Sequence, residues 1–251
     1  MKKFNDSELF EKAITYGSLY DSFWSCTKGV IWKDSVARFK LNAVTELDEL
    51  RKEIINGEYR MQDPILFMVH EPKERIIQSL IFRDKVFQKS LCDNVLVPIF
   101  TKVFIYDNGA SMKHKGYSFA MNRLDTHLRK FYAKNKRDGW ILKCDIHHYF
   151  DSINHDILMG MVEEYISDER LLFYLRDSIS KYGTDNTGLG LGSQINQTFA
   201  LLYLNKMDHF LKEKLHIKYY GRYMDDFYLI HDDKEYLKYC RSQIEEQITW
   251  N

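Results

Sequence analysis

Apolar residues in the first hundred positions recur every three or four residues, the spacing that puts them on one face of a helix. The pattern predicts helices over residues 7–24, 43–56 and 78–100. Gly57 follows the second of these in the position where a left-handed residue commonly ends a helix. The first third of the chain is therefore expected to be helical, and no low-complexity linker divides it.

The pattern changes near residue 139. Residues 140–146 alternate large apolar side chains with others, the period of a strand, and residues 151–166 return to helical spacing. A glycine-dense loop over 183–192 precedes a helix expected over 193–215, apolar on most sides and hence buried. The aromatic-rich segment 217–232 predicts a hairpin with Asp225 and Asp226 at its tip. This order of elements predicts an α+β fold.

Composition adds limits to this picture. The 251 residues are 45% hydrophobic, enough for one or two domains. No uncharged apolar run approaches the ~18 residues that cross a bilayer, so we expect a cytoplasmic protein without a membrane partner. Four cysteines without a CxxC pair indicate neither a disulfide framework nor a zinc site. The net charge is zero, yet residues 113–137 hold eight Lys or Arg and one acid, which indicates either a nucleic-acid contact or a solvated helix face.

Asp225 and Asp226 repel each other and resist burial, so a hairpin tip that carries both needs an explanation. A solvated turn is one reading. Asp145, however, ends the strand expected over 140–146, and if that strand pairs beside the hairpin, three carboxylates meet at one end of a sheet. Carboxylates together with phosphate oxygens are the ligands that Mg²⁺ prefers.

Four segments carry a resemblance to a known family. Tyr-Met-Asp-Asp at 223–226 resembles the signature of reverse transcriptases, and 142–158 resembles the first aspartate motif of their bacterial branch. Residues 75–88, with an Arg-Asp-Lys triplet at 83–85, and 109–118 resemble fingers motifs of the group II intron and diversity-generating retroelement lineages. The resemblance covers residues 57–233. The loop departs from the group II pattern of Pro-Gln-Gly and then Ser-Pro, because Gly190-Leu191-Gly192 and then Asn196-Gln197 stand there. The glutamine in the second position, Gln197, resembles diversity-generating and some defence-associated enzymes, which have Ser-Gln there.

The resemblance implies an α+β right-hand polymerase fold with helical fingers and a palm with a small antiparallel sheet. The helical thumb that the family places after the palm is expected to be absent from these residues, either because the chain is a fragment or because a partner supplies the thumb. Residues 1–138 would form the fingers with an N-terminal helical extension and part of the palm, and 139–251 the palm core that carries the aspartates.

The resemblance also implies the site. Catalytic and metal-binding roles fall to Asp145, Asp225 and Asp226, with the backbone carbonyl of Ile146 as a further metal ligand, for two Mg²⁺ ions that Mn²⁺ could replace. The ring of Phe150 would exclude a 2′-hydroxyl, with Tyr149 as the competing candidate. The other implied contacts are Arg75, Leu191 and Gln197 to the nucleotide, and Tyr223, Lys113, Lys115, Arg83 and Gly192 to primer or template.

The implied function is RNA-directed DNA polymerisation, copying an RNA template into cDNA. Its partners would be RNA, a DNA primer, dNTPs and an accessory protein or RNA from the same operon. Three alternatives stay open: a maturase-like protein that holds an intron RNA, a phage-defence enzyme with untemplated or protein-primed synthesis, and a metal phosphohydrolase unrelated to nucleic acids.

Overall fold

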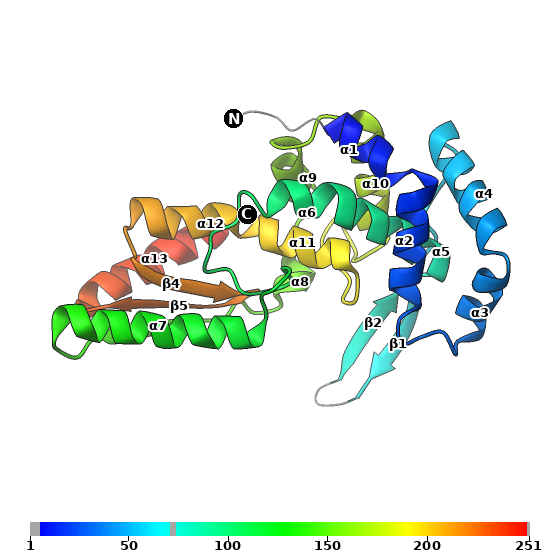
Figure 1. Cartoon of the computed structure of the whole chain (residues 1–251). Coiled ribbons are helices and arrows are strands. Elements are labelled where there is room, and N and C mark those ends of the chain that lie inside the picture. The colour runs from blue at the N-terminus through cyan, green and yellow to red at the C-terminus, as the bar shows by residue number, and fades with distance from the viewer. Residues whose placement is uncertain (1–5, 71–73, 250–251) are drawn as a thin grey trace. The chain divides into compact units, whose positions relative to one another are not determined.

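Residues 6–70 and 74–249 are described in the computed structural model, as helices together with two small antiparallel sheets (Figure 1). The chain divides into two compact units: the first unit contains residues 1–102 and 153–199, and the second unit contains 103–152 and 200–251. The chain passes between them three times. Residues 103–138 belong with the sheet and residues 153–199 with the helices, so the two units alternate along the chain.

The first unit begins with four helices, α1 (Asp6–Ala13), α2 (Tyr16–Thr27), α3 (Asp34–Leu41) and α4 (Ala43–Asn56). The single helix predicted over 7–24 is two helices, because the Thr15 side chain accepts a hydrogen bond from the Ser18 amide at 3.2 Å and starts a new helix. α4 has the predicted bounds, and Gly57 after it has a φ of 70°.

A hairpin follows, in which β1 (Ile65–Val69) pairs antiparallel with β2 (Arg75–Ser79). The chain then forms α5 (Phe82–Leu91), a π-helical turn η1 (Cys92–Leu96) and α6 (Val97–Phe100). The prediction of helix from residue 78 was wrong for its first residues, since 78 and 79 lie in β2. All five β1 residues are apolar and all are exposed, so the sequence lacks the alternation of apolar and polar side chains that indicates a strand.

The rest of the first unit consists of α9 (His155–Glu163), α10 (Glu169–Ser180) and the first part of α11 (Gln194–Tyr203). Its core is rich in aromatic rings from distant parts of the sequence: Phe10, Phe23, Phe39, Tyr59, Phe87 and Tyr174 are all buried.

The second unit is built on a three-stranded antiparallel sheet in the order β3 (Trp140–Cys144), β5 (Asp226–His231), β4 (Tyr219–Tyr223). In Figure 1, α7 (Tyr117–Asn135) lies along one side of β4 and β5, with α12 (Asn205–His209) and α13 (Lys234–Thr249) on the other. The short α8 (Tyr149–Ser152) and a π-helical turn η2 (Phe210–Lys214) complete the unit. Phe131 of α7 packs with Tyr219 and Ile230 of the sheet. The strand over 140–144 and the hairpin confirm the sequence pattern, whereas the helix predicted over 193–215 is divided at Leu204.

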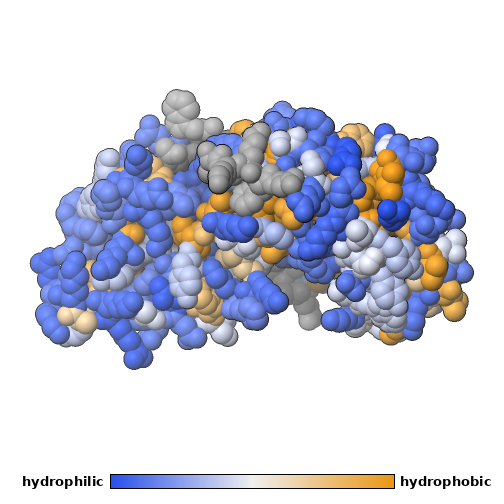
Figure 2. Space-filling view, turned by 45° about the horizontal axis from the view of Figure 1, so that its top comes forward, coloured by the Kyte–Doolittle hydropathy of each residue, from blue (hydrophilic) through white to orange (hydrophobic). Residues whose placement is uncertain are grey.

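The face drawn in Figure 2 is mostly hydrophilic, with apolar residues gathered in separate areas. Among residues 6–70 and 74–249, no helix combines the length and the apolar character that a membrane span requires. All four cysteines are free.

Candidate active site

The register of the sheet brings the three predicted acids to one end of it. Cys144 pairs with Phe227, and the next residue outward on the two strands is Asp145 on one and Asp226 on the other. Asp226 in turn pairs with Tyr223 across the hairpin, so Asp225 lies in the two-residue turn between β4 and β5. The convergence expected from the sequence depended on this strand pairing beside the hairpin, and the structure contains that pairing.

The turn has an uncommon backbone. Met224, its first residue, has a φ of 56°, a left-handed conformation that costs a side-chain-bearing residue about 1–2 kcal/mol. The Met224 carbonyl accepts a hydrogen bond from Nη1 of Arg222 at 3.0 Å. A strained residue held by a neighbouring side chain thus immediately precedes Asp225.

The three acids interact electrostatically. Partial burial raises the pKa of Asp225, and repulsion from Asp145 and Asp226 raises this pKa further, against a lowering by the Arg222 guanidinium. Lys143 on β3 places its Nζ 3.3 Å from Oδ1 of Asp226, with both side chains largely exposed. The site is therefore a concentration of negative charge that the protein's own cations offset only in part.

This donor set suits a hard divalent cation. Within the described residues, no three His, Cys, Asp or Glu side chains form a cluster that could hold a metal ion by themselves. Mg²⁺, however, is usually bound by one or two carboxylates together with water and substrate phosphates, and not by an all-protein cage. Three acidic side chains at an open sheet end fit an ion that shares its ligands with a nucleotide.

A buried ion pair, which the sequence reasoning missed, fixes the strand before the turn. The Arg222 side chain is wholly inaccessible, and its Nε and Nη2 donate to Oδ1 and Oδ2 of Asp208 at 2.8 and 2.6 Å. The Tyr220 hydroxyl also donates to Asp208, at 2.5 Å. The available signal was an arginine inside an aromatic strand and an acid inside an apolar helix, neither of which is buried without a partner.

Residues after β3 carry the predicted sugar contact. Tyr149 is buried, and its hydroxyl donates to the Ala200 carbonyl at 2.5 Å, so it faces the core as the alternation indicated. Phe150 is only partly buried, and its ring contacts that of Tyr149 at a centroid distance of 5.7 Å. Ile146 lies in the irregular stretch between β3 and α8. Of the two aromatic candidates, Phe150 is the one that keeps accessible surface.

A mostly apolar cavity of about 440 Å³ in the second unit is lined by one of the three acids, Asp226. Tyr223, Asp226 and Lys143 line it from the sheet, and Tyr117 and Met121 line it from α7. A cavity of this size beside convergent polar groups has the character of a ligand site.

The basic stretch over 113–137 is partly used within the second unit. Lys115 donates to the Tyr106 and Asn108 carbonyls at 2.7 and 3.0 Å, and partial burial lowers its pKa. Arg123 is paired with Asp107 at 2.6 Å. Lys113, by contrast, is exposed, as are Lys130 and Lys134 on α7.

The other predicted contacts lie in the first unit. Arg75 begins β2, opposite Val69, and its side chain lies outside the described part of the chain. Arg83 makes two hydrogen bonds to Glu53 of α4, at 2.8 and 2.9 Å. The loop residues Leu191 and Gly192 and the α11 residue Gln197 are all at least partly accessible, and Gly192 has a φ of 109°, which favours glycine.

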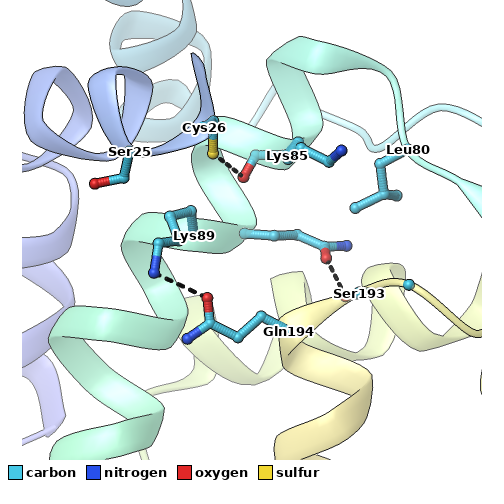
Figure 3. Close-up of a pocket in the computed structure, with 9 residues that line it drawn as sticks. Ser25, Cys26, Leu80, Lys85, Lys89, Ser193 and Gln194 are labelled. Atoms are coloured by element: carbon cyan, nitrogen blue, oxygen red, sulfur yellow. Dashed lines mark hydrogen bonds between the residues drawn. The ribbon is translucent and has the colours of Figure 1, made fainter. Parts of the chain in front are cut away.

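Gly192 also lines a cavity of about 190 Å³ within the first unit (Figure 3). Cys26 of α2, Lys85 and Lys89 of α5, and Gln194 at the start of α11 surround it. Lys89 donates to Gln194 at 3.0 Å, and buried Gln88 accepts from Ser193 at 2.7 Å. The glycine loop is thus connected to α5, the helix that carries the Arg-Asp-Lys triplet.

Comparison with known sequences agrees with these motifs. A family model described as "Reverse transcriptase (RNA-dependent DNA polymerase)" matches residues 70–251. The chain is 25% identical over 194 residues to the protein YkfC of Escherichia coli, covering 72% of this chain and 50% of that protein. It is 30% identical over 92 residues to an "Uncharacterized 91 kDa protein in cob intron" of Schizosaccharomyces pombe, covering 34% of this chain and 11% of that protein. The chain thus spans half or less of the length of these relatives.

Solved structures show a related fold. Apo telomerase from Candida tropicalis, truncated from its C-terminal domain, matches with a TM-score of 0.53 at 14% identity, over 80% of this chain and 51% of that one. Telomerase from Candida albicans, in complex with a TWJ fragment of telomeric RNA, matches with a TM-score of 0.54 at 12% identity, over 75% and 40%. These likenesses confirm the predicted α+β polymerase fold. Together with the match over residues 70–251, the acids gathered at one sheet end lead to one conclusion: the chain belongs to the reverse transcriptase (RNA-dependent DNA polymerase) family.

Proposed function

We propose that this chain is an RNA-directed DNA polymerase that extends a DNA primer with dNTPs on an RNA template. The observation that carries the proposal is the meeting of Asp145, Asp225 and Asp226 at one end of the sheet. Two bound Mg²⁺ ions, or Mn²⁺ in their place, would activate the primer 3′-hydroxyl and neutralise the charge that develops on the leaving pyrophosphate. The three carboxylates, with the Ile146 carbonyl, would hold them.

The remaining side chains would orient the reactants. In the second unit, Phe150 would lie against the sugar of the incoming nucleotide and Tyr223 would line the primer end. The guanidinium of Arg75 suits triphosphate oxygens, and Leu191, Gly192 and Gln197 would border the nascent pair. Exposed lysines such as Lys113 would contact phosphates without reading sequence. Arg83 and Lys115 would have to exchange their present partners to take part.

Primer extension with the full chain tests the proposal. Wild-type protein should extend a DNA primer on RNA, and Asp225→Asn should abolish extension, because the site loses a ligand at its centre. Asp48→Asn is the matched control, an equal charge change at a half-exposed acid of α4 that pairs with Lys52. Asp225→Asn with a tenth or more of the wild-type rate would contradict the assignment of this acid.

A second candidate function has support from relatives. Two of them carry names that place them in introns, the cob intron protein and a "Putative COX1/OXI3 intron 2 protein" of Saccharomyces cerevisiae, which is 26% identical over 142 residues. A maturase-like chain would bind a structured intron RNA tightly whether or not Asp225 is intact. Extension assays on RNA, on DNA and without template, together with RNA-binding measurements on Asp225→Asn, separate this role from a copying enzyme and from an untemplated defence synthase. A cytoplasmic location fits each of these roles.

A further inference from the structure

Arg222 carries a buried charge whose bonds extend beyond its partner acid. The residue is 2% exposed and Asp208 is 0% exposed, and a buried charge is tolerated only when it is paired and fully hydrogen-bonded. Two donors go to Asp208, and Nη2 also donates to the Leu201 carbonyl at 3.1 Å. These contacts anchor the guanidinium to the backbone of α11 and to the Asp208 side chain of α12.

One further contact reaches the turn. Nη1 of Arg222 donates to the carbonyl of Met224, the residue with the left-handed backbone directly before Asp225. Apolar residues of similar volume often stabilise a protein as well as a buried ion pair does, so stability alone does not explain this arrangement. A rigid, planar donor fork, by contrast, fixes the geometry of what it binds.

We propose that Arg222 is a positioning residue: anchored by Asp208, it holds the Met224 carbonyl and thereby keeps Asp225 in the orientation that faces Asp145 and Asp226. The inference deepens the proposed function and rests on it for the role of the acids. Arg222 acts through the turn and touches neither ion nor nucleotide. Its loss should therefore weaken metal binding and lower kcat, while KM for dNTP stays near its wild-type value.

The test uses Arg222→Lys in the full chain, with Mn²⁺ alone as the probe and no nucleic acid. Lysine keeps a positive charge for Asp208 but has no planar fork to reach Met224 as well. Removing a group that orients metal ligands typically costs about 10–100-fold in metal affinity, and we expect a loss in this range by electron paramagnetic resonance. Tyr220→Phe is the matched control. Tyr220 lies on the same strand as Arg222, and its substitution removes one hydrogen bond to the same buried Asp208 while leaving the turn untouched. Its Mn²⁺ affinity should stay within about twofold of wild type.

Met224→Gly gives an independent check. Glycine adopts the left-handed conformation without strain, so the turn should depend less on Arg222, and the double variant should recover part of the Mn²⁺ affinity lost in Arg222→Lys. Equal affinity in Arg222→Lys and wild type, or an equal loss in Tyr220→Phe, would overturn the proposal. If Arg222→Lys does not fold, Asp208→Asn takes its place. If neither variant folds, the Arg222–Asp208 ion pair is needed for folding itself, and the positioning proposal is likewise overturned.

The same measurements keep the two proposals apart. If Mn²⁺ affinity falls in Arg222→Lys as expected but the wild-type protein extends no primer on any template, the proposed function fails and the positioning role survives. If primers are extended equally well by wild type and Arg222→Lys, with unchanged metal affinity, the positioning role fails and the function stands.

Discussion

Gly221 lies on β4 directly under the ring of Tyr228, and replacing it with alanine should strain the β4–β5 hairpin. An added Cβ would lie 2.7 Å from the Tyr228 hydroxyl oxygen and 2.9 Å from two of its ring carbons, closer than real contacts allow. The ring would have to move. Its hydroxyl is bonded to Nδ1 of His127 at 3.0 Å, so movement breaks that bond.

The partners of His127 show which atom donates the hydrogen in its bond with Tyr228. Burial lowers the His127 pKa to about 4, so the ring is neutral at pH 7. The Arg123 guanidinium, which only donates, contacts Nε2 at 3.2 Å, and this leaves Nδ1–H to donate to Tyr228. Overpacking typically costs about 1–3 kcal/mol and a lost hydrogen bond about 1 kcal/mol, so Gly221→Ala should destabilise the protein by about 2–4 kcal/mol.

Urea denaturation followed by circular dichroism measures this cost. Gly160→Ala is the comparison, since Gly160 lies within α9 with no atom within 4 Å of an added Cβ, and alanine there should add about 0.5–1 kcal/mol of stability. Tyr228→Phe removes the nearest atom, so the cost of Gly221→Ala should be smaller in that background. A Gly221→Ala protein as stable as wild type would refute the reasoning.

Three further outcomes are expected. Burial and neighbouring acids raise the pKa of Asp225 above its unfolded value, so ionisation of Asp225 destabilises the fold as pH rises from the unfolded pKa through the folded pKa. Metal-free Asp225→Asn should therefore be more stable than wild type at pH 7, and this gain should vanish near pH 4. A pH-independent difference in denaturant titrations would contradict this. Phe150→Ala should admit ribonucleotides, measured as rNTP against dNTP incorporation, and an unchanged ratio would move the gate elsewhere. Under the proposed function Leu191 borders the nascent pair, so Leu191→Gln should supply a polar contact there and lower misincorporation in sequenced cDNA, by tenfold for each ~1.4 kcal/mol of discrimination gained. An unchanged error spectrum would show that the loop does not control fidelity.

The second unit was predictable where its side chains alternate. Residues 140–144 were predicted as a strand because apolar and other side chains alternate. The sequence left open whether that strand pairs beside the hairpin, which is what brings Asp145 next to Asp226. The acids were found because carboxylates in apolar surroundings conflict with burial, and such conflicts mark sites. Arg222 and Asp208 carry the same kind of conflict, but their pairing spans two elements and depends on tertiary structure.

Elsewhere the spacing of apolar residues was insufficient to predict the secondary structure. β1 is apolar on both faces and exposed on both, so the periodicity of apolar residues could not distinguish it from a loop or a helix. The helix predicted from residue 78 wrongly included the last residues of β2. The break between α11 and α12 at Leu204 was missed because no proline or glycine stands there to indicate it. The residues expected from fingers motifs, Arg83 among them, were assigned by resemblance, and the bidentate contact of Arg83 with Glu53 could not be read from either residue alone.

The interleaving of the two units has a consequence for how the protein can be made. Residues 6–102 leave the ribosome well before residues 153–199, which complete their core, and residues 103–152 emerge in between without strands β4 and β5. Neither unit can finish folding from a contiguous stretch of nascent chain, and β3 must wait for the pairing that Asp226–His231 supplies about eighty residues later. Synthesis of this chain therefore favours late, nearly simultaneous consolidation of both units, and a chain divided between residues 102 and 200 should yield two aggregation-prone fragments.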